Sequence, residues 1–445
     1  VLDITNPEAP PKLLGELTTT SSGTKLGFTS PIPTPVVMKS DSAAGEWYLV
    51  LGSGPQAAEP MDAIKGKSEQ KPRVAVIPLK GLTGVGEATK KPMRIPTTGP
   101  TADNAGVIVL DASANGFVSD LISVDFDVSP YYMTDAVYFG TVEHGAGGDG
   151  YDNDWDGRLY RLVTRDLDGE GAQEPTSPDE WTANLLINVA QPITAAAAVG
   201  KDANNYWIYF GTGRFFDAGL DKPDNATQSF YGIKEPRADE NGKLEFTWEE
   251  VDKNDLFDAT NVVVTQAESL YANNVTCPDA DCLPNEETSF ADLISYVAGV
   301  PGGTNDNDET GNPLGGWRRD FQRDRERNLG QATLLGGLLT FTTYQPFNDP
   351  CQQDGQSFLY GLHYQTGTSH FRSVFGGLGL GDDNQVLESF LLGRGLAITP
   401  NLHVGSGNPT AFIQTSTGVI IEIPQTDLPN NEFRSGRRSW REIVK

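Results

Sequence analysis

The chain is poor in cysteine, histidine and basic residues, and each shortage excludes a class of function. Three cysteines and four histidines occur in 445 residues. They show no C-x-x-C, H-E-x-x-H or H-x-x-E-H spacing, which argues against a zinc site. Lysine and arginine number 33 against 60 acidic residues, for a formal charge of −27. That balance argues against nucleic-acid binding and against adhesion to an anionic membrane through a basic face.

Motifs for catalysis and for membrane insertion are also missing. The sequence has no G-x-S-x-G nucleophile elbow, no P-loop and no apolar run long enough to span a membrane. The glycine-rich segments 145–150 and 376–381 precede no helical pattern, so we expect no phosphate site there. We therefore expect a protein that is not an enzyme and does not insert into a membrane.

Two of the three cysteines are close enough in sequence to pair in an oxidising compartment. Cys277 and Cys282 lie in the short loop TCPDADC, where a local disulfide would form after export. Cys351 is then the odd one, either free or paired elsewhere. The first residues, VLDI, lie within a strand pattern and lack an initiating Met, so we expect a mature or trimmed piece of an exported protein.

Glycine and proline are abundant, with 49 and 29 residues, which suits many short strands and turns. One phrase recurs, an apolar strand that closes in G-[ST] or T-[ST]: LVLGSG, VYFGTV, IYFGTG, LTFTTY and AFIQTS. Five such copies at intervals of roughly 60 to 130 residues predict an all-β fold, a modified β-propeller of about six to seven blades with long loop insertions. We expect residues 1–445 to form this single domain, with glycine at the strand ends because inner strands crowd near the axis.

Residues 238–330 break the repeat. This stretch is acidic and contains one short helical pattern at 289–297, SFADLISYV. We predict an inserted region with a short helix that lies on one face of the propeller. Loops of this length in compact domains tend to carry function.

A calcium loop is predicted between two strands, where residues 152–157 spell D-x-D-x-D-G. Carboxylates at alternate positions can converge on one hard cation, and the glycine permits the turn that follows. A bidentate Glu would end a hand-type loop at the position of Val163, so the shell would need Glu143 or Asp149 from the preceding turn. The alternative is a solvated acidic turn. The predicted ligands are the side chains of Asp152, Asp154 and Asp156 and the backbone carbonyl of Arg158.

A second acidic loop has similar spacing. Asp306, Asp308 and Thr310 precede Gly311 and would offer a weaker set of oxygens to Ca²⁺. A plain surface loop is the alternative, and we favour it here. Asp217, Asp221 and Asp224 are expected to be turn residues.

Several longer phrases, in order and spread over nearly the whole chain, resemble one family. They are VLDITNPEAP, WYLVLGSGP, DAVYFGT with GRLYRL, QPITAAAAVG with IYFGTGRFF, QSFYGIK, ERNLGQATLLGGLLTFTTYQPFNDPC, SFLYGLHYQTGT and RRSWREI. The chain resembles the C-terminal β-propeller domain of the PilC/PilY family of type IV pilus tip adhesins and biogenesis factors. The resemblance implies export to the cell surface, a place at the pilus tip with the minor pilins, binding to a surface or host receptor, and calcium control of extension and retraction. It also implies a variable N-terminal domain upstream.

The chain departs from the family at the expected calcium loop, which the resemblance places at residues 127–135. Only Asp127, Ser129 and Asp135 could still offer oxygens there, because Pro130 and Tyr131 replace the middle of the loop. The D-x-D-x-D-G loop lies one strand later and is predicted to be a relocated site.

Three functions remain open from the sequence. The first is a tip and adhesion module whose loops contact a surface or partner, with calcium ordering one loop. The second is a quinoprotein-type propeller oxidoreductase, which would need an adjacent cysteine pair and regularly placed tryptophans that this sequence lacks. The third is a scaffold that only caps the minor pilins.

Overall fold

The structure is a computed structural model, and the statements below concern the residues that it describes. These are residues 2–4, 6–13, 25–29, 31–38, 46–79, 107–112, 114–126, 133–144, 155–165, 175–176, 178, 180–240, 243–277, 288–299, 315–349, 352, 354–404 and 408–426. No helix in these ranges is both long enough and apolar enough to cross a membrane.

Five sheets follow one another along the chain, and each is built from mainly antiparallel strands. The strands are consecutive except in sheet 3, where shorter elements lie between the strands. Sheet 1 consists of β3 (Thr34–Met38), β4 (Glu46–Gly52), β5 (Arg73–Pro78) and β6 (Val107–Val109). Sheet 2 consists of β7 (Asn115–Val124), β8 (Ala136–His144), β9 (Trp155–Asp156), β10 (Arg158–Val163) and β11 (Thr182–Asn188). Sheet 3 consists of β12 (Ala198–Lys201), β13 (Tyr206–Gly211), β14 (Ser229–Lys234), β21 (Gly316–Asp320) and the parallel strand β17 (Leu256–Asp258).

Sheets 4 and 5 complete the series. Shorter elements lie outside the five sheets. Sheet 4 consists of β22 (Arg327–Asn328), β23 (Thr333–Leu335), β24 (Leu338–Pro346), β25 (Gly355–His363) and β26 (Ser389–Arg394). Sheet 5 has β27 (Asn401–His403), β28 (Thr410–Gln414) and β29 (Ile420–Pro424). Outside the sheets lie β1 (Leu2–Asp3), β2 (Lys12–Leu13), α1 (Pro60–Ile64), α3 (Ala218–Asp221) and the 3₁₀ turns η2 (Gly376–Gly379) and η3 (Asp382–Asn384).

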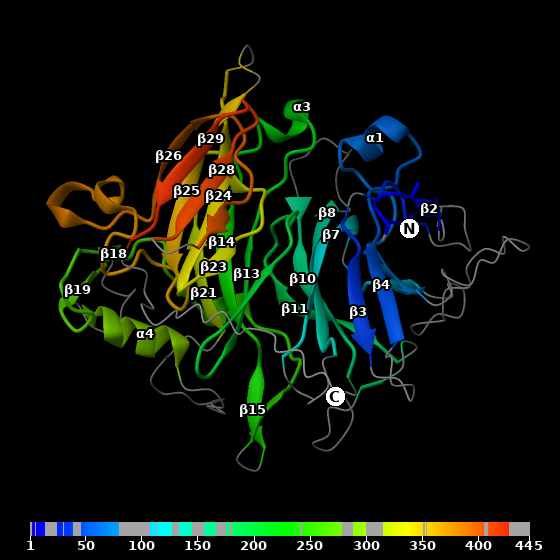
Figure 1. Cartoon of the computed structure of the whole chain (residues 1–445), viewed down its shortest axis with the longest axis horizontal. Helices are drawn as coiled ribbons and strands as arrows, with labels where there is room; N and C mark the ends of the chain where they lie inside the picture. Colours follow the sequence, from blue (N-terminus) through cyan, green and yellow to red (C-terminus); the bar gives the residue numbers. More distant parts are fainter. Residues whose placement is uncertain are drawn as a thin grey trace, which may run out of the picture.

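Several shorter elements lie between β14 and β21, in the first part of the region 238–330 that was predicted as an insertion. The prediction extended too far, because β21 and β22, which lie in the same range, belong to sheets 3 and 4. The shorter elements are β15 (Arg237–Glu240), β16 (Lys243–Phe246), η1 (Lys253–Asp255), β18 (Val263–Val264), β19 (Asn273–Thr276), β20 (Thr288–Ser289) and α4 (Phe290–Ala298). The predicted helix at 289–297 is therefore present, and the Ser289 hydroxyl caps it by accepting the N–H of Asp292. In Figure 1 the sheets succeed one another from β3 and β4 on the right to β25 and β28 on the left. There α1 and α3 lie at one end of the strands, and α4 and β15 lie at the other.

Apolar side chains fill the space between each sheet and the next. Four clusters join sheets 1 and 2, 2 and 3, 3 and 4, and 4 and 5 in turn. Successive residues of a strand point to opposite faces. In β8, accordingly, Val137 and Phe139 contact sheet 1 while Ala136 and Tyr138 contact sheet 3. Burial on both faces explains why such strands are continuously apolar rather than alternating.

The repeated glycine lies where the next sheet enters. A Cβ on Gly52 would stand 2.6 Å from Val118 Cγ1, and one on Gly140 would stand 2.3 Å from Ile193 Cγ2. The glycines were expected at strand ends, and they are there, but the crowding comes from the neighbouring sheet rather than from the axis. Only a residue without a side chain allows this approach.

The residue after each glycine fastens two segments at once. The Ser53 carbonyl accepts the N–H of Val118 from sheet 2 at 2.8 Å, and its hydroxyl accepts the N–H of Arg73 from the next strand of its own sheet at 3.1 Å. Thr141 repeats both bonds in sheet 2, at 3.0 Å in each case, and Thr212 repeats them in sheet 3, at 2.9 and 2.8 Å. The G-[ST] phrase is therefore the joint between successive sheets.

The prediction of an all-β, propeller-like architecture is confirmed. Within the described ranges there are five blade-like sheets, fewer than the six to seven that the sequence predicted. The entering segments of all five line one cavity of about 270 Å³, contributed by Pro31, Phe117, Thr194, Leu329 and Leu396 among others. Convergence on one cavity is what a common axis requires.

The close approach at this joint predicts that adding one methyl group to the glycine lowers the stability of the fold. Gly140→Ala should lower the free energy of unfolding by about 1–3 kcal/mol because Ile193 and the backbone that it belongs to must shift. Gly377→Ala is the control, since a Cβ there meets no atom within 4 Å, and it should be nearly neutral. Urea denaturation of both variants checks this, and equal midpoints would contradict it.

Candidate recognition site where the insertion meets sheet 4

Backbone hydrogen bonds hold the insertion against the connection between β25 and β26. The N–H of Val386 donates to the Val264 carbonyl at 2.8 Å, and the N–H of Gln266 donates to Asn384 at 2.8 Å. A third bond runs from the N–H of Ala267 to the Phe371 carbonyl at 3.0 Å. Segments more than a hundred residues apart are thus joined like strands of one sheet.

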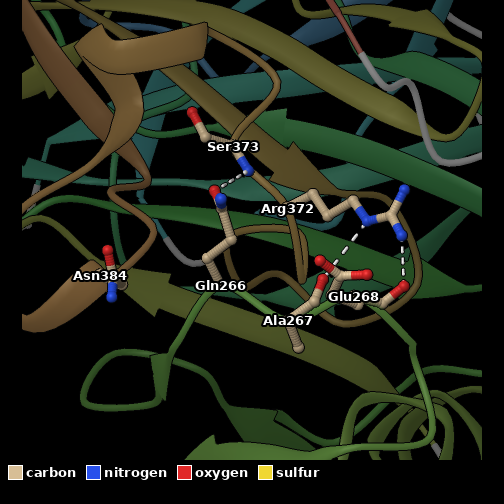
Figure 2. A pocket seen from close by; sticks show the side chains of 6 residues that line it. All are labelled: Gln266, Ala267, Glu268, Arg372, Ser373 and Asn384. Atoms are coloured by element: carbon tan, nitrogen blue, oxygen red, sulfur yellow. Dashed lines mark hydrogen bonds between the residues drawn. The ribbon is translucent and has the colours of Figure 1, made fainter.

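A polar cleft of about 510 Å³ opens along this seam (Figure 2). The insertion supplies one wall and the β25–β26 connection the other. Because the lining carries amide, carboxylate and guanidinium groups, it suits a polar ligand such as a peptide or a hydroxylated surface better than an apolar one. The lining residues are Gln266, Ala267, Glu268, Arg372, Ser373 and Asn384.

Arg372 organises the floor of the cleft. Its Nε donates to the Ala267 carbonyl at 3.3 Å, and its Nη2 donates to the Glu268 carbonyl. Its guanidinium also lies 5.2 Å from the ring centre of Phe371. Figure 2 shows Gln266 reaching across the cleft to accept the backbone N–H of Ser373, at 3.4 Å. These bonds fix the shape of the cleft while the Glu268 carboxylate stays at its exposed edge.

Two buried histidines next to the cleft pack against the helix of the insertion. The rings of His363 and His370 stack 5.9 Å apart, and Phe290 of α4 meets both edge-on at 5.1 and 5.6 Å. Burial lowers the pKa of His370 to about 4 and that of His363 well below its usual value. Both rings are therefore neutral at physiological pH and act as packing groups.

Lys234 anchors the far end of α4. Its ammonium donates to the carbonyls of Val297 and Ala298 at 2.9 and 3.2 Å, which are helix-terminal acceptors without an intrahelical partner. Burial lowers the pKa of Lys234 to about 8. The helix is therefore fixed at both ends to the propeller.

The predicted calcium loop is described only at its C-terminal end. Asp149, Asp152 and Asp154 lie outside the described residues, whereas Asp156 lies in β9 opposite Glu143. The Arg158 carbonyl accepts the Thr141 hydroxyl at 3.3 Å. Calcium at this loop stays a prediction.

Glu143, the optional fifth ligand, is occupied within the scaffold. It is fully buried, forms an ion pair with Arg158 and accepts the Thr141 hydroxyl at 2.7 Å. Both of its oxygens thus have internal partners. A cation would have to displace a buried arginine to bind it, which is costly.

Trp155, which lies within the predicted loop, packs between charged and aromatic neighbours. The Arg214 guanidinium lies 3.3 Å from its ring centre, and the His144 ring meets it edge-on at 4.6 Å. Arg214 also donates to the Lys65 carbonyl at 2.6 Å and pairs with buried Asp221. Burial lowers the pKa of Arg214 to about 10, so it remains charged at neutral pH.

Of the weaker metal candidates, four lie outside the described residues and one is buried in the scaffold. Asp127, Asp306, Asp308 and Thr310 lie outside the described residues. Asp135 is buried, pairs with Arg165 and accepts the N–H of Phe126 at 2.6 Å. Burial, only partly offset by the arginine, raises the pKa of Asp135.

Two smaller predictions can be checked in part. Asp217 caps α3 by accepting the N–H groups of Gly219 and Leu220, and Asp224 accepts the N–H of Ala226 at 3.0 Å, as expected of turn residues. Asp221, expected in a turn as well, is instead a buried residue of α3 that pairs with Arg214. Cys277 is in a disulfide, whereas Cys282 and Cys351 lie outside the described part, so the pairing stays a prediction. No group of three or more potential metal-ligating side chains occurs in the ranges given above.

One solved structure matches the chain over nearly its whole length. It is the C-terminal domain of PilY1 from Pseudomonas aeruginosa, with a TM-score of 0.56 and 18% sequence identity. The match covers 95% of this chain and 77% of that one. The chain has the fold of the PilY1 C-terminal domain. The architecture expected from the resemblance to the PilC/PilY family is thereby confirmed.

Other comparisons add no argument. A neuraminidase-like protein from A/bat/Guatemala/164/2009 gives a TM-score of 0.27 at 8% identity, covering 88% of this chain and 70% of that one. Drosophila Semaphorin 2a gives 0.26 at 10% identity, covering 90% and 54%. Scores this low define no shared fold. No protein-family model and no curated protein matches the sequence.

Sequence reasoning missed the cleft and the role of the histidines. It placed function in the insertion, but the other wall of the cleft comes from the β25–β26 connection. The sequence signal was the cluster His370-Phe371-Arg372, in which aromatic and basic residues adjoin a long glycine-rich connection. Without the contact to Phe290 and Ala267, nothing distinguished it from a surface loop.

The histidine pair predicts acid-sensitive folding. The pKa of His370 falls from 6.5 to about 4 on folding, so the unfolded chain binds more protons between these values. Stability is then complete above pH 6.5 and declines as the pH falls towards 4. His370→Phe keeps a ring but removes this titration, and it should reduce the loss by up to about 3 kcal/mol.

Thermal unfolding between pH 4 and 7 measures the effect. The exposed His403 provides a matched control, and His403→Gln should leave the pH dependence unchanged. Parallel curves for His370→Phe and the unmodified protein would contradict the assignment.

Proposed function

We propose that the chain is a type IV pilus-associated module at the cell surface that acts by binding rather than by catalysis. The observation that carries the proposal is the fold shared with the PilY1 C-terminal domain over 95% of the chain. The order of the family-like phrases supports the same assignment. Export is consistent with the disulfide at Cys277.

The distribution of charge supports a binding role. The buried ion pairs Glu143–Arg158, Asp135–Arg165 and Glu235–Arg161 join strands and sheets. These ion pairs connect parts of the scaffold and do not face a cavity. The charged groups of a catalytic site would need to lie in a cavity. The cleft, in contrast, is lined by polar groups of Gln266, Glu268 and Arg372 that a surface or protein ligand can reach.

Within that role we propose that the cleft contacts a surface or host receptor and that the module belongs to the minor-pilin tip complex. The inserted region and the β25–β26 connection both depart from the blade pattern, and variation of loops on a fixed scaffold is how such folds acquire recognition. Adhesion and control of retraction would both depend on this placement. A purely structural cap of the minor pilins is the alternative, and a quinoprotein-type oxidoreductase is the alternative from another class.

Pilus association is tested in cells that make the chain as part of its native protein. We expect it in the sheared type IV pilus fraction, and we expect deletion to reduce surface piliation and surface adhesion together. Recovery of the protein apart from pili, with piliation unchanged, would contradict the proposal. Quinone absorbance in the purified protein would favour the oxidoreductase.

A charge reversal separates adhesion from assembly. Glu268→Arg, at the exposed edge of the cleft, should lower adhesion several-fold and leave piliation intact. Glu8→Arg, an exposed position outside the five sheets, is the charge-matched control. Unchanged adhesion in the cleft variant would favour the structural cap.

We also propose that Ca²⁺ binds the Asp152 loop and orders it. A cation that binds only the ordered loop stabilises it in proportion to the logarithm of its concentration. Calorimetry should show heat at millimolar Ca²⁺, abolished in Asp152→Asn/Asp154→Asn and retained in the control Asp306→Asn/Asp308→Asn. Heat lost only in the control would place the ion in the second acidic loop.

A further inference from the structure

Sheet 5 differs from the other four sheets in one respect. In sheets 1 to 4 the third strand carries a fourth, antiparallel strand on its outer edge: β5 with β6, β10 with β11, β14 with β21, and β25 with β26. The third strand of sheet 5 is β29, because Leu396, just before β27, lines the central cavity as the entering segments of the other sheets do. Among the described residues, β29 pairs only with β28.

The hydrogen bonds at both ends of β29 fix which of its groups face outward. The backbone N–H of Thr415 donates to the Val419 carbonyl at 2.9 Å, and the backbone N–H of Gln425 donates to the Pro409 carbonyl at 2.7 Å. Bonded and non-bonded pairs alternate along an antiparallel ladder. Ile421 and Ile423 therefore bond to β28, and the backbone groups of Ile420, Glu422 and Pro424 point away from the sheet.

The side chains of β29 divide between the two faces. Ile423 is buried and Ile421 half-buried against sheet 4. On the opposite face Ile420 is 67% exposed, and Glu422 and Pro424 are also exposed. The strand thus offers two outward N–H donors, three outward carbonyls and an apolar flank.

We propose that β29 is the acceptor edge for an extended segment of a partner protein, which adds as the missing fourth strand of sheet 5. Only another extended backbone matches a row of alternating donors and acceptors at strand spacing. The added strand would run antiparallel, as in the other four sheets. Since Pro424 has no N–H, pairing centres on Ile420 and Glu422.

Charge selects the partner. The chain carries a formal charge of −27, so two copies repel one another and β29-to-β29 pairing is disfavoured. Glu422 stands on the free edge, where an opposite charge directly across a strand pair is favourable. The partner segment should therefore alternate apolar residues with lysine or arginine. The inference rests on the sheet edge and does not require the pilus assignment.

The chain itself supplies the probes. A synthetic peptide of residues 315–321 (GGWRRDF) copies β21, which fills the equivalent edge of sheet 3 and contains two arginines. A peptide of residues 181–188 (WTANLLIN) copies β11 and has no charged side chain. Fluorescence anisotropy of dye-labelled peptides should show binding of both, with tighter binding of the arginine peptide that weakens with added salt.

Three variants locate the binding. Glu422→Pro removes an outward donor without removing a bond to β28, and it should weaken both peptides at least tenfold. Glu422→Gln keeps the donor and should weaken only the arginine peptide. Ile420→Lys leaves the ladder intact and should repel the arginine peptide, so it keeps the test decisive should Glu422→Pro unfold.

Three results would overturn the proposal. The first is failure of both peptides to bind. The second is slow amide hydrogen exchange at Ile420 and Glu422 in the chain alone, which would mean that a segment of the chain already covers the edge. The third is a dimer in sedimentation that Glu422→Pro abolishes, which would make a second copy the occupant.

Discussion

Sheets 1 to 4 of this protein are held each to the next by the same small joint. At the end of the second strand a glycine leaves room for the entering segment of the following sheet, and the next residue binds it. Ser53, Thr141 and Thr212 each accept one N–H from the neighbouring sheet and one from the next strand of their own. Because backbone groups buried between sheets must be bonded, this joint sets the spacing and order of the sheets.

Packing between the sheets limits where side chains can be charged. Space between the sheets is filled by apolar clusters, and the buried charges that occur there are paired, as in Glu235 with Arg161 and with the Tyr138 hydroxyl. A scaffold packed in this way has little freedom for chemistry in its interior. The connections lie outside this packing and can lengthen without disturbing the joint.

The insertion shows how one connection acquired a defined surface. Its helix α4 is fixed by Phe290 against two neutral histidines and by Lys234 at the opposite end. Backbone bonds then seal its β18 segment to the β25–β26 connection. The result is a rigid polar cleft between two regions remote in sequence, and a rigid site loses less entropy on binding than a mobile loop.

Much of the architecture was determined by the sequence alone. The repeated strand-glycine-hydroxyl phrase predicted small sheets in succession, and the residue pattern predicted the helix at 289–297. These features are local, since they depend on strand propensity, on alternation and on the steric freedom of glycine. The predicted insertion at 238–330 included β21 and β22, which belong to sheets 3 and 4. Only the tertiary structure decided which segment crowds each glycine, that Glu143 and Asp135 serve internal arginines, and that β29 pairs with β28 alone among the residues it describes. Those outcomes depend on contacts between residues far apart in the chain, and composition and spacing carry no information about such contacts.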